Sequence, residues 1–406
     1  MKLTILSQYY PPEVGAPQNR LHELAIRLKK EGWDIEVLTA MPNYPDMVIH
    51  EKYRNLKYHH EFIDDISVHR APIYVTKEKG VVKRLTNYFS FVYSSWKVGR
   101  KKLEKTDFLM VESPPLFLGI SAYFLSKKLG ARFIFNVSDL WPESAEKLGI
   151  VTNKLFLSLA TQLEQWCYRQ ADFITGQTQG IVKDIQTRFP NKPVYWLPNG
   201  VDLTFFKPGT GGVQWRAEKG FQPDDLIFLY AGIHGHAQGL EVILNAANTC
   251  KHYNKVHFVF VGDGPEKTDL EDLKEKLKLE RVHFFGLVPK SEMPRIVSAA
   301  DAALVPLKKL PLFEGAIPSK IFENLATEKP IILGVNGEAK HLFIDDGKSG
   351  IHFEPEDDKQ LAQVIGSIAE GKIDLKTLGA NGRVYVNEKF NRDNIARGFI
   401  KALEEL

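Results

Sequence analysis

A lysine and a glutamate one helical turn apart are the clearest sign of chemistry in this sequence. Pro318, Ser319 and Lys320 open a predicted helix, and Glu323 follows on the same face as Lys320. Free N–H groups at a helix start attract anions, and the lysine adds a positive charge. The spacing predicts a site where a nucleoside diphosphate rests its phosphates on this turn and its ribose hydroxyls on Glu323. A surface helix with an ordinary Lys–Glu pair is the alternative.

The chain around this segment alternates between short apolar runs and amphipathic stretches. The runs predict strands near residues 3–6, 34–39, 66–71, 107–111, 132–136, 172–176 and 194–197, and in a second series 226–231, 256–261, 282–285, 302–305, 330–333 and 350–353. Helices are predicted between them, among others at 19–30, 239–249, 266–278, 291–299 and 319–327. Such alternation is typical of parallel sheets with helices on both faces. We therefore expect an α/β protein of two doubly wound, Rossmann-like domains facing a cleft, with ligands beyond the carboxyl ends of the strands.

The two series also predict the domain boundaries. The first domain is expected over residues 1–197 and the second over 198–387. The terminal helix, 388–406, is expected to return to the first domain and complete it. The stretch 207–212 contains three glycines and a proline, which makes it the best candidate for a linker.

Composition excludes several classes of protein. The chain has 406 residues, 44% of them hydrophobic and 25% charged, which are ordinary globular values. Its net charge of +3 is too small for a general nucleic-acid binder. The two cysteines, Cys167 and Cys250, form no C-x-x-C motif, which fits a reducing compartment. Neither a signal peptide nor an uninterrupted membrane span is recognisable, so we expect a cytoplasmic location.

A basic and aromatic segment at 77–105 stands out from this balance. It holds nine Lys or Arg residues against two Glu residues, a local charge of +7. An apolar stripe at helical spacing predicts a helix that packs on the sheet, through Val82, Leu85, Phe89, Val92, Trp96 and Leu103. Additional apolar surface comes from Tyr88, Phe91 and Tyr93, and positive charge from Lys97, Arg100, Lys101 and Lys102. We expect these residues to face an anionic membrane; a core helix with a solvated basic end is the alternative.

Common cofactor motifs are missing. The loop after the first strand, 8–17, lacks G-x-G-x-x-G spacing, and the second strand ends at 39–40 without the acid that a dinucleotide enzyme needs. No Walker loop is present. Acidic pairs at 64–65 and 345–346 are expected in solvated turns rather than at a metal. The sequence predicts neither a cofactor nor a metal.

Several short motifs, taken in order, resemble glycosyltransferase family 4, the retaining GT-B transferases that use sugar nucleotides. They lie at 10–15, 197–202, 261–265, 286–288, 300–306 and 318–323, and the resemblance covers nearly the whole chain. Two further segments, 139–144 and 237–241, are similar to bacterial N-acetyl-fucosamine transferases of O-antigen and capsule assembly.

The resemblance implies roles for individual residues. Gly15 would let the donor diphosphate approach the backbone, Val288 would lie against the base, and Glu323 would bind the ribose. The family carries a second glutamate, which contacts the transferred sugar, eight residues before Glu323. That position is Gly315 here, with Glu314 one residue earlier, so either Glu314 serves through a bulge or the role has moved.

The phosphate loop also departs from the family pattern. Its usual arginine and lysine are absent, and the loop offers His234, His236 and Gln238 instead. A diphosphate still needs positive groups, and Arg20 is a further candidate together with the histidines. The histidines are alternatively polar loop residues with no ligand role.

The His-Asp pair that the family places in its first domain reads Ser138 and Asp139 here. We expect Asp139 to orient the acceptor hydroxyl or to act as a base, unless it caps the turn before Trp141.

Three functions remain open. The leading one is metal-independent, retaining transfer of a sugar from a UDP-sugar to a polyprenyl-diphosphate-linked saccharide, by an enzyme bound peripherally to the inner face of the cytoplasmic membrane. N-acetyl-fucosamine or a related deoxy amino sugar is the expected donor sugar. The second is a nucleotide-sugar epimerase, which would leave the basic segment unexplained. The third is a non-catalytic nucleotide-binding partner, which the missing phosphate-loop cations would favour.

Overall fold

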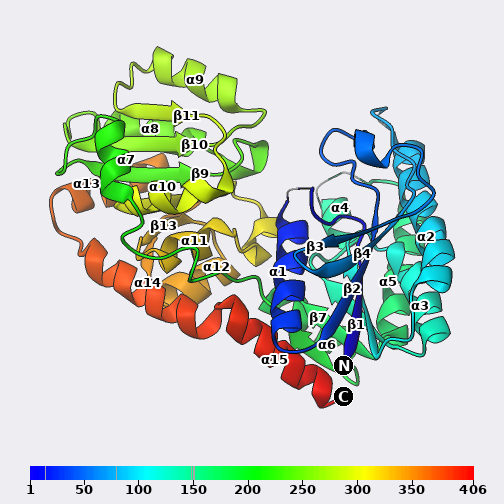
Figure 1. Cartoon of the computed structure of the whole chain (residues 1–406). Coiled ribbons are helices and arrows are strands. Elements are labelled where there is room, and N and C mark those ends of the chain that lie inside the picture. The colour runs from blue at the N-terminus through cyan, green and yellow to red at the C-terminus, as the bar shows by residue number, and fades with distance from the viewer. Residues whose placement is uncertain (14, 79, 148, 150) are drawn as a thin grey trace. The chain divides into compact units, whose positions relative to one another are not determined.

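The computed structural model describes residues 1–13, 15–78, 80–147, 149 and 151–406, and it divides into two compact units. The first unit comprises Met1–Asn199 and Ile395–Leu406, and the second Gly200–Asn394. The chain thus changes units at Asn199–Gly200, close to the predicted boundary, and the end of the chain belongs to the first unit. Each unit is a sheet with helices on both faces (Figure 1).

The first unit contains an eight-stranded sheet in the order β3-β4-β2-β1-β5-β6-β7-β8. Its strands are β1 (Lys2–Leu6), β2 (Asp34–Ala40), β3 (His59–Ile63), β4 (Ile66–Ala71), β5 (Phe108–Ser113), β6 (Arg132–Val137), β7 (Phe173–Gly176) and β8 (Val194–Trp196). All neighbours are parallel except β3 and β4. The edge strand β3 was not predicted, because its charged and half-exposed residues lack an apolar run.

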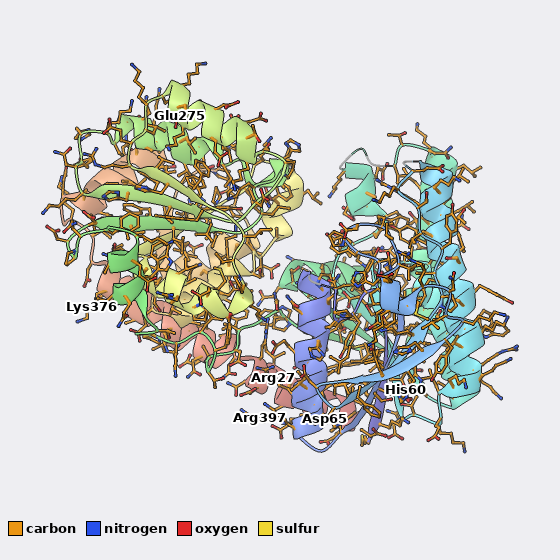
Figure 2. All side chains as sticks on the ribbon, turned by 45° about the horizontal axis from the view of Figure 1, so that its top comes forward. Arg27, His60, Asp65, Glu275, Lys376 and Arg397 are labelled. Carbon is orange, nitrogen blue, oxygen red and sulfur yellow. The ribbon has the colours of Figure 1, made fainter. Side chains whose placement is uncertain are left out.

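Helices cover both faces of this sheet. Buried side chains of α2 (Val81–Lys102), α3 (Leu118–Leu129), α5 (Lys154–Gln170) and α6 (Gln179–Arg188) form one core with the sheet. Those of α1 (Ala16–Lys30) and α15 (Arg392–Glu404) form the core on the other face. Arg397 of α15 also forms an ion pair with Glu31, the residue after α1, with 3.5 Å between Nη1 and Oε1 (Figure 2).

Helix α2 packs with a different face from the one predicted. Its buried side chains include Asn87, Phe91, Ser95 and Val98, whereas Val82, Leu85, Phe89, Val92 and Trp96 of the predicted stripe are half-buried or exposed. Small residues explain the correction. Ser95 Oγ meets Ser121 Oγ of α3 at 2.8 Å, and a Cβ on Gly99 would lie 2.8 Å from a methyl group of Leu125. Helix α3 therefore approaches α2 along Ser95 and Gly99, and larger apolar residues face outward.

The second unit contains a six-stranded, fully parallel sheet in the order β11-β10-β9-β12-β13-β14. Its strands are β9 (Leu226–Ala231), β10 (Val256–Val261), β11 (Val282–Phe285), β12 (Ala302–Pro306), β13 (Ile331–Gly334) and β14 (Gly350–His352). The order runs outward in one direction from β9 and in the other from β12. The boundary between β9 and β12 is therefore the topological switch point, where ligands of such sheets bind.

Helices again cover both faces of the second sheet (Figure 1). Buried residues of α8 (Glu241–Thr249), α9 (Lys267–Lys276) and α13 (Asp358–Ala369) form a core on one face. The other helices are α7 (Gly212–Glu218), α10 (Met293–Ala299), α11 (Lys320–Ala326), α12 (Glu338–Lys340) and α14 (Leu375–Lys389).

The glycine-rich stretch 207–212 is not the linker that was predicted, since it lies inside the second unit. Gly209 and Gly211 adopt positive φ values of 74° and 67°, which form the turn before α7. Gly212 lies so close to the backbone of Ser298 in α10 that a side chain would collide with it. The glycines therefore serve a turn and close helix packing.

Candidate functional site

Most of the predicted site residues of the second unit follow the carboxyl ends of its strands. The loop after β9 carries His234, His236 and Gln238, and Val288 follows β11. The segment after β12 leads through Glu314 to α11. Backbone bonding joins the β9 and β12 segments directly, because Lys308 N donates to Ala237 O at 3.0 Å. The switch point is therefore built from these two connected segments.

Three glycines lie where the loops that follow β9 and β10 meet. Gly232, Gly262 and Gly264 have φ values of 147°, 141° and 158°, which other residues rarely adopt. A Cβ on Gly262 would collide with Gly232 O, and one on Gly264 with the His234 carbonyl oxygen. The two loops thus meet backbone to backbone, and main-chain groups rather than side chains form this part of the surface.

Lys320 lies directly against Tyr230 and Gly232. Its Nζ is 3.7 Å from the ring centroid of Tyr230, and a Cβ on Gly232 would lie 3.0 Å from Nζ. The Tyr230 hydroxyl donates to Ile233 O at 2.6 Å, which fixes the ring beneath the lysine. Within the described part of the chain, no hydrogen bond or ion pair reaches Nζ. Burial lowers the pKa of Lys320 to about 7, although the nearby Glu323 carboxylate opposes this.

Glu323 lies one turn further along α11 and is half-buried. Its carboxylate accepts no hydrogen bond from the described residues. Burial raises its pKa, against the attraction of Arg392, Lys290 and Lys320. A half-buried carboxylate without a donor can accept hydrogen bonds from the hydroxyl groups of a ligand.

His234 lies beneath the loop rather than on it. Its side chain is fully buried, and neither ring nitrogen has a hydrogen-bond partner among the described residues. The ring packs against Tyr230, Phe260 and Phe284, with centroids 5.9, 6.1 and 5.9 Å away. Burial lowers its pKa and favours the neutral ring. The predicted direct contact of His234 with phosphate is therefore wrong for this conformation.

The other loop residues are more accessible. His236 is exposed, and its Nδ1 forms an ion pair with Glu266 Oε1. Gln238 ends the short 3-10 helix His236–Gln238 and is half-buried. Val288 is half-buried after β11, and its role toward a base stays a prediction.

Glu314 lines a pocket of about 360 Å³ at the carboxyl ends of β12 and β13. It lies in the 3-10 helix Pro311–Gly315 and is exposed. A Cβ on Gly337 would collide with its carbonyl oxygen, so the turn packs tightly against the loop after β13. Lys308, Asn336 and several apolar residues complete the lining. The glutamate thus stands at a hollow beside the switch point, although one residue earlier than the family pattern.

The start of α11 offers a weaker anion-binding site than its sequence predicted. Pro318 is half-buried, while Ser319 is the exposed N-cap residue and makes no side-chain capping bond. The helix has only seven residues, so its dipole is small. The positive character of this site comes mainly from Lys320.

The first unit holds a buried hydrogen-bond network at the carboxyl ends of three neighbouring strands, which was not predicted from the sequence. The register aligns Glu112 of β5 with Asn136 of β6, and Asn136 with Thr175 of β7. Arg20 Nη2 donates to both Glu112 oxygens, at 2.7 and 2.8 Å, and to Ser138 Oγ at 2.6 Å. Asn136 donates to Glu112, and Thr175 to Asn136. Arg20 is therefore held by a carboxylate of its own domain, and its predicted contact with the donor must use its other nitrogens.

Gly15 and Asp139 have local roles in the same unit. Gly15 has an extended φ of −179°, which any residue adopts, and a Cβ there would collide with Gln18 Oε1. Asp139 is half-buried, and its Oδ2 accepts from Ser144 Oγ at 2.7 Å. This side-chain bond gives Asp139 a structural partner, but it is not a cap, and the catalytic role of Asp139 stays a prediction.

The basic residues of α2 lie on its exposed surface. Lys97, Arg100, Lys101 and Lys102 are all exposed, and three of them lie over aromatic rings. The Arg100 guanidinium is 4.3 Å from the ring centroid of Trp96. None of the described helices is long and apolar enough to cross a membrane. The described residues also hold no group of three His, Cys, Asp or Glu side chains that could bind a metal ion.

Comparison with known protein families covers both units. Residues 15–200 match the glycosyl transferase 4-like domain, and residues 213–385 match the glycosyl transferases group 1 domain. Each unit thus matches a glycosyltransferase domain, and each match covers somewhat less than half of the chain. The resemblance read from the short motifs is confirmed at this level, while its narrower part, to N-acetyl-fucosamine transferases, stays a prediction.

Two curated relatives are glycosyltransferases by name, one of them in colanic acid biosynthesis. It is 26% identical to the colanic acid biosynthesis glycosyl transferase WcaI of Escherichia coli K12, over 98% of this chain and 99% of the relative. It is also 26% identical to the glycosyltransferase WbjE of Pseudomonas aeruginosa, over 71% of this chain and 72% of the relative.

Solved structures share the fold of this glycosyltransferase. Sucrose-phosphate synthase of Thermosynechococcus elongatus superposes with a TM-score of 0.74 at 19% identity, covering 100% of this chain and 98% of that one. HepE of Anabaena, solved in complex with UDP, gives a TM-score of 0.72 at 17% identity over 100% of both chains. The predicted fold of two Rossmann-like GT-B domains is confirmed.

Proposed function

We propose that this glycosyltransferase transfers a sugar from a UDP-sugar to a polyprenyl-diphosphate-linked saccharide, with retention of the anomeric configuration. The reaction would serve the synthesis of a surface polysaccharide such as O-antigen or capsule. One relative is named for colanic acid biosynthesis, and HepE has also been solved in complex with UDP-glucose. These findings support a nucleotide-sugar donor and a saccharide acceptor.

One observation carries the donor proposal. The ammonium of Lys320 and the carboxylate of Glu323 lie on one face of α11, and neither has a partner among the described residues. Partly buried charges without partners are costly unless a ligand satisfies them. A nucleoside diphosphate offers phosphate oxygens for Lys320 and ribose hydroxyls for Glu323. Gly232 presents bare backbone beside Lys320, so a phosphate held by Nζ would lie close to the main chain.

The pocket at Glu314 supports a place for the transferred sugar. It opens at the carboxyl ends of β12 and β13, beside the segment that leads to α11. Glu314 can accept hydrogen bonds from sugar hydroxyls there, as the second glutamate of the family does. In the first unit, Asp139 would orient the acceptor hydroxyl or remove its proton.

Release of UDP tests this function and separates it from the alternatives. The full chain would be incubated with UDP-N-acetyl-fucosamine and other UDP-sugars, with and without a polyprenyl-diphosphate-linked saccharide. We expect UDP release that depends on the acceptor and is largest for a deoxy amino sugar, with the α-linkage of the donor retained in the product. Conversion of the UDP-sugar without UDP release would favour an epimerase. Binding of UDP without turnover of any donor would favour a non-catalytic partner.

We also propose that the first unit docks on the inner face of an anionic membrane, where a lipid-linked acceptor is found. Helices α2 and α5 leave large apolar side chains exposed near their starts, including Val82, Phe89, Leu155 and Leu159. The ring of Phe117 joins the two helices, with centroids 4.8 Å from Phe89 and 6.3 Å from Phe156. The exposed apolar groups near the starts of α2 and α5 and the four exposed basic residues at the end of α2 together suit a lipid interface.

Vesicle co-sedimentation tests the docking proposal. Each basic residue near an anionic surface contributes roughly 1 kcal/mol, so replacing four should weaken binding on the order of a thousandfold. The test variant changes Lys97, Arg100, Lys101 and Lys102 to Gln. A control changes four exposed lysines of the second unit to Gln, namely Lys276, Lys359, Lys376 and Lys389. The parent and control should pellet with phosphatidylglycerol vesicles and the test variant should not; equal pelleting of all three contradicts the proposal.

A further inference from the structure

Lys320 occupies an unusual place for a cation. Its ammonium lies over the Tyr230 ring, against Gly232, and the described residues offer it no hydrogen bond and no ion pair. An ammonium with its donors unsatisfied in a half-buried position is unfavourable. The Tyr230 ring attracts the charged form but accepts none of the ammonium's ordinary hydrogen bonds, so burial favours the neutral amine in the empty site. A diphosphate would require the charged form.

The groups that face Lys320 do not replace a counterion. Glu323, on the same helix, attracts the charge of Lys320 but is too far away for an ion pair. Arg392 and Lys290 also attract the Glu323 carboxylate. From β9, Tyr230 presents its ring, and burial raises the pKa of its hydroxyl. From the loop after β9, His234 is kept neutral by burial and by Lys267, against the attraction of Asp263. Lys320 is thus surrounded by neutral groups and one distant carboxylate.

We propose that a diphosphate bound beside Lys320 brings a proton with it, so that the ammonium forms as the donor binds. This inference rests on the proposed donor site. The free amine takes one proton from a buffer acid, which becomes its conjugate base, and no covalent bond is formed or broken. Phosphate oxygens then accept the ammonium's hydrogen bonds and offset its burial.

Linkage fixes the size and pH dependence of this uptake. With its pKa at about 7, free Lys320 carries roughly a tenth of a proton at pH 8. Bound beside a diphosphate, the lysine would be fully protonated at that pH. We therefore expect Lys320 to take up about 0.9 proton per UDP at pH 8 and roughly a tenth of a proton at pH 6. At pH 6 the terminal phosphate of UDP also loses protons on binding, which lowers the net uptake further.

Two other titrating groups can be separated from Lys320 by pH. The terminal phosphate of UDP, with a pKa of about 6, is fully ionised at pH 8 and neither takes up nor releases a proton there. His234 has its pKa lowered below the usual value of 6.5, so an uptake through it would be centred below pH 7 and be absent at pH 8.5.

Calorimetry of UDP binding to the full chain tests the proposal. Titrations at pH 6 and pH 8 in Tris and in Hepes, whose ionisation enthalpies differ, give the number of protons taken up. We expect the uptake to increase from pH 6 to pH 8. Binding of UDP with equal enthalpies in both buffers at pH 8 overturns this inference and leaves the proposed function standing. Absence of UDP binding overturns both.

Two variants locate the proton. K320R carries a permanent charge, so it should bind UDP with no uptake at pH 8, because arginine cannot supply a neutral form. H234Q keeps Lys320 and should keep the uptake. Uptake that survives in K320R, or that disappears in H234Q, assigns the proton to another group and contradicts the proposal. Where K320R does not fold, the pH dependence of the parent's uptake decides, since a midpoint below pH 6.5 would exclude Lys320.

Discussion

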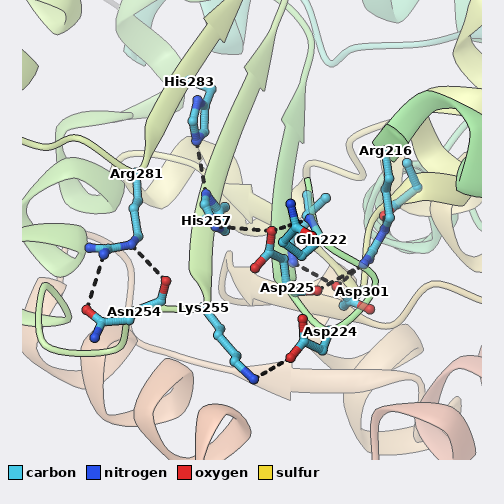
Figure 3. Close-up of polar contacts among 12 residues, drawn as sticks. Arg216, Gln222, Asp224, Asp225, Asn254, Lys255, His257, Arg281, His283 and Asp301 are labelled. Carbon is cyan, nitrogen blue, oxygen red and sulfur yellow. Dashed lines mark hydrogen bonds and ion pairs between the residues drawn. The ribbon is translucent and has the colours of Figure 1, made fainter. Parts of the chain in front are cut away.

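The charged side chains at the amino edge of the second sheet have partners within the chain, whereas those of α11 at its carboxyl edge have none in the part of the chain that the structure describes. At the amino ends of the strands, each charged side chain labelled in Figure 3 has a partner within the chain. Asp301 Oδ2 accepts from Arg216 Nη2 at 2.6 Å and from Ile227 N at 2.7 Å. Arg281 donates to Asn254, at 2.8 Å to its carbonyl oxygen and 3.1 Å to its Oδ1.

At the carboxyl ends, the charged groups of α11 have no such partners among the described residues. Lys320 faces a ring and bare backbone, and Glu323 accepts no hydrogen bond. Both edges belong to the same sheet, so burial and strand geometry do not explain the contrast. Satisfied polar groups stabilise a fold, whereas unsatisfied ones destabilise it unless a ligand binds. We therefore interpret the amino edge as stabilising the fold and the α11 end of the carboxyl edge as the place for a ligand.

The largest effect is expected from breaking the paired edge. Arg216 donates to Ala299 O at 2.7 Å and to Asp225 O at 2.9 Å, besides Asp301. R216M removes all these bonds and leaves a half-buried carboxylate with fewer donors, which costs about 3 kcal/mol. We expect the Tm to fall by roughly 5–10 °C, with the Kd for UDP unchanged.

The control for this experiment is K376M, at an exposed position of α14 (Figure 2). Scanning calorimetry measures the Tm, and titration at a temperature where both variants are folded measures the Kd. A Tm equal to that of K376M would show that the paired edge contributes little to stability.

The unpaired edge should respond in the opposite way. E323A removes the carboxylate that we assign to the ribose, and the loss of a charge-assisted bond to a hydroxyl costs about 1.5–3 kcal/mol. The affinity for UDP should fall by about 10- to 150-fold, while the Tm changes little. E275A, on the exposed surface of α9, is the matched control (Figure 2). UDP binding by E323A as tight as that of E275A in calorimetry would refute the assignment.

Features of the fold and the site that depend on neighbouring residues were predicted from the sequence, whereas those that depend on distant residues were not. Buried parallel strands are nearly continuous apolar runs, so β9, β10 and β11 were predicted with their observed bounds. The edge strand β3 and the buried face of α2 were not, since pairing at an edge and packing through Ser95 and Gly99 depend on neighbours distant in sequence.

Lys320 and Glu323 were found from sequence because their spacing on one helix is local. The Tyr230 ring beneath Lys320 was missed, because it comes from β9, far away in the chain. Glu112 was missed as well, since only strand register brings it beside Asn136. A glutamate and an asparagine that end neighbouring predicted strands are the signal that could have found it.

Acid should also destabilise the paired edge, through its histidines. His257 Nδ1 and His283 Nε2 are 3.0 Å apart, and burial together with His257 lowers the pKa of His283 to about 4. Burial also lowers the pKa of His257, although Asp225 opposes this. In the unfolded chain both rings titrate near 6.5, so between pH 6.5 and 4 the unfolded state binds more protons and the fold loses stability as pH falls.

Urea unfolding at several pH values measures this loss. One additional proton bound on unfolding gives a slope of about 1.4 kcal/mol per pH unit. H283Q should flatten the dependence between pH 6.5 and 4 and leave UDP binding at pH 8 unchanged. A profile as steep as that of the parent would mean that other groups control the acid response.

The smallest effect on activity is expected from chelating divalent metal ions. This experiment tests whether Lys320 at the unpaired edge can meet the phosphate charge without a metal ion. Lys320 lies beside Gly232, where we place the diphosphate, and its Nζ has no hydrogen-bond or ion-pair partner among the described residues. Its ammonium can stabilise the departing diphosphate without a divalent ion. Sugar transfer should therefore continue unchanged in EDTA. Complete loss of UDP release in EDTA, restored by Mg²⁺ or Mn²⁺, would show that the edge is incomplete without a metal ion and that Lys320 alone does not meet the phosphate charge.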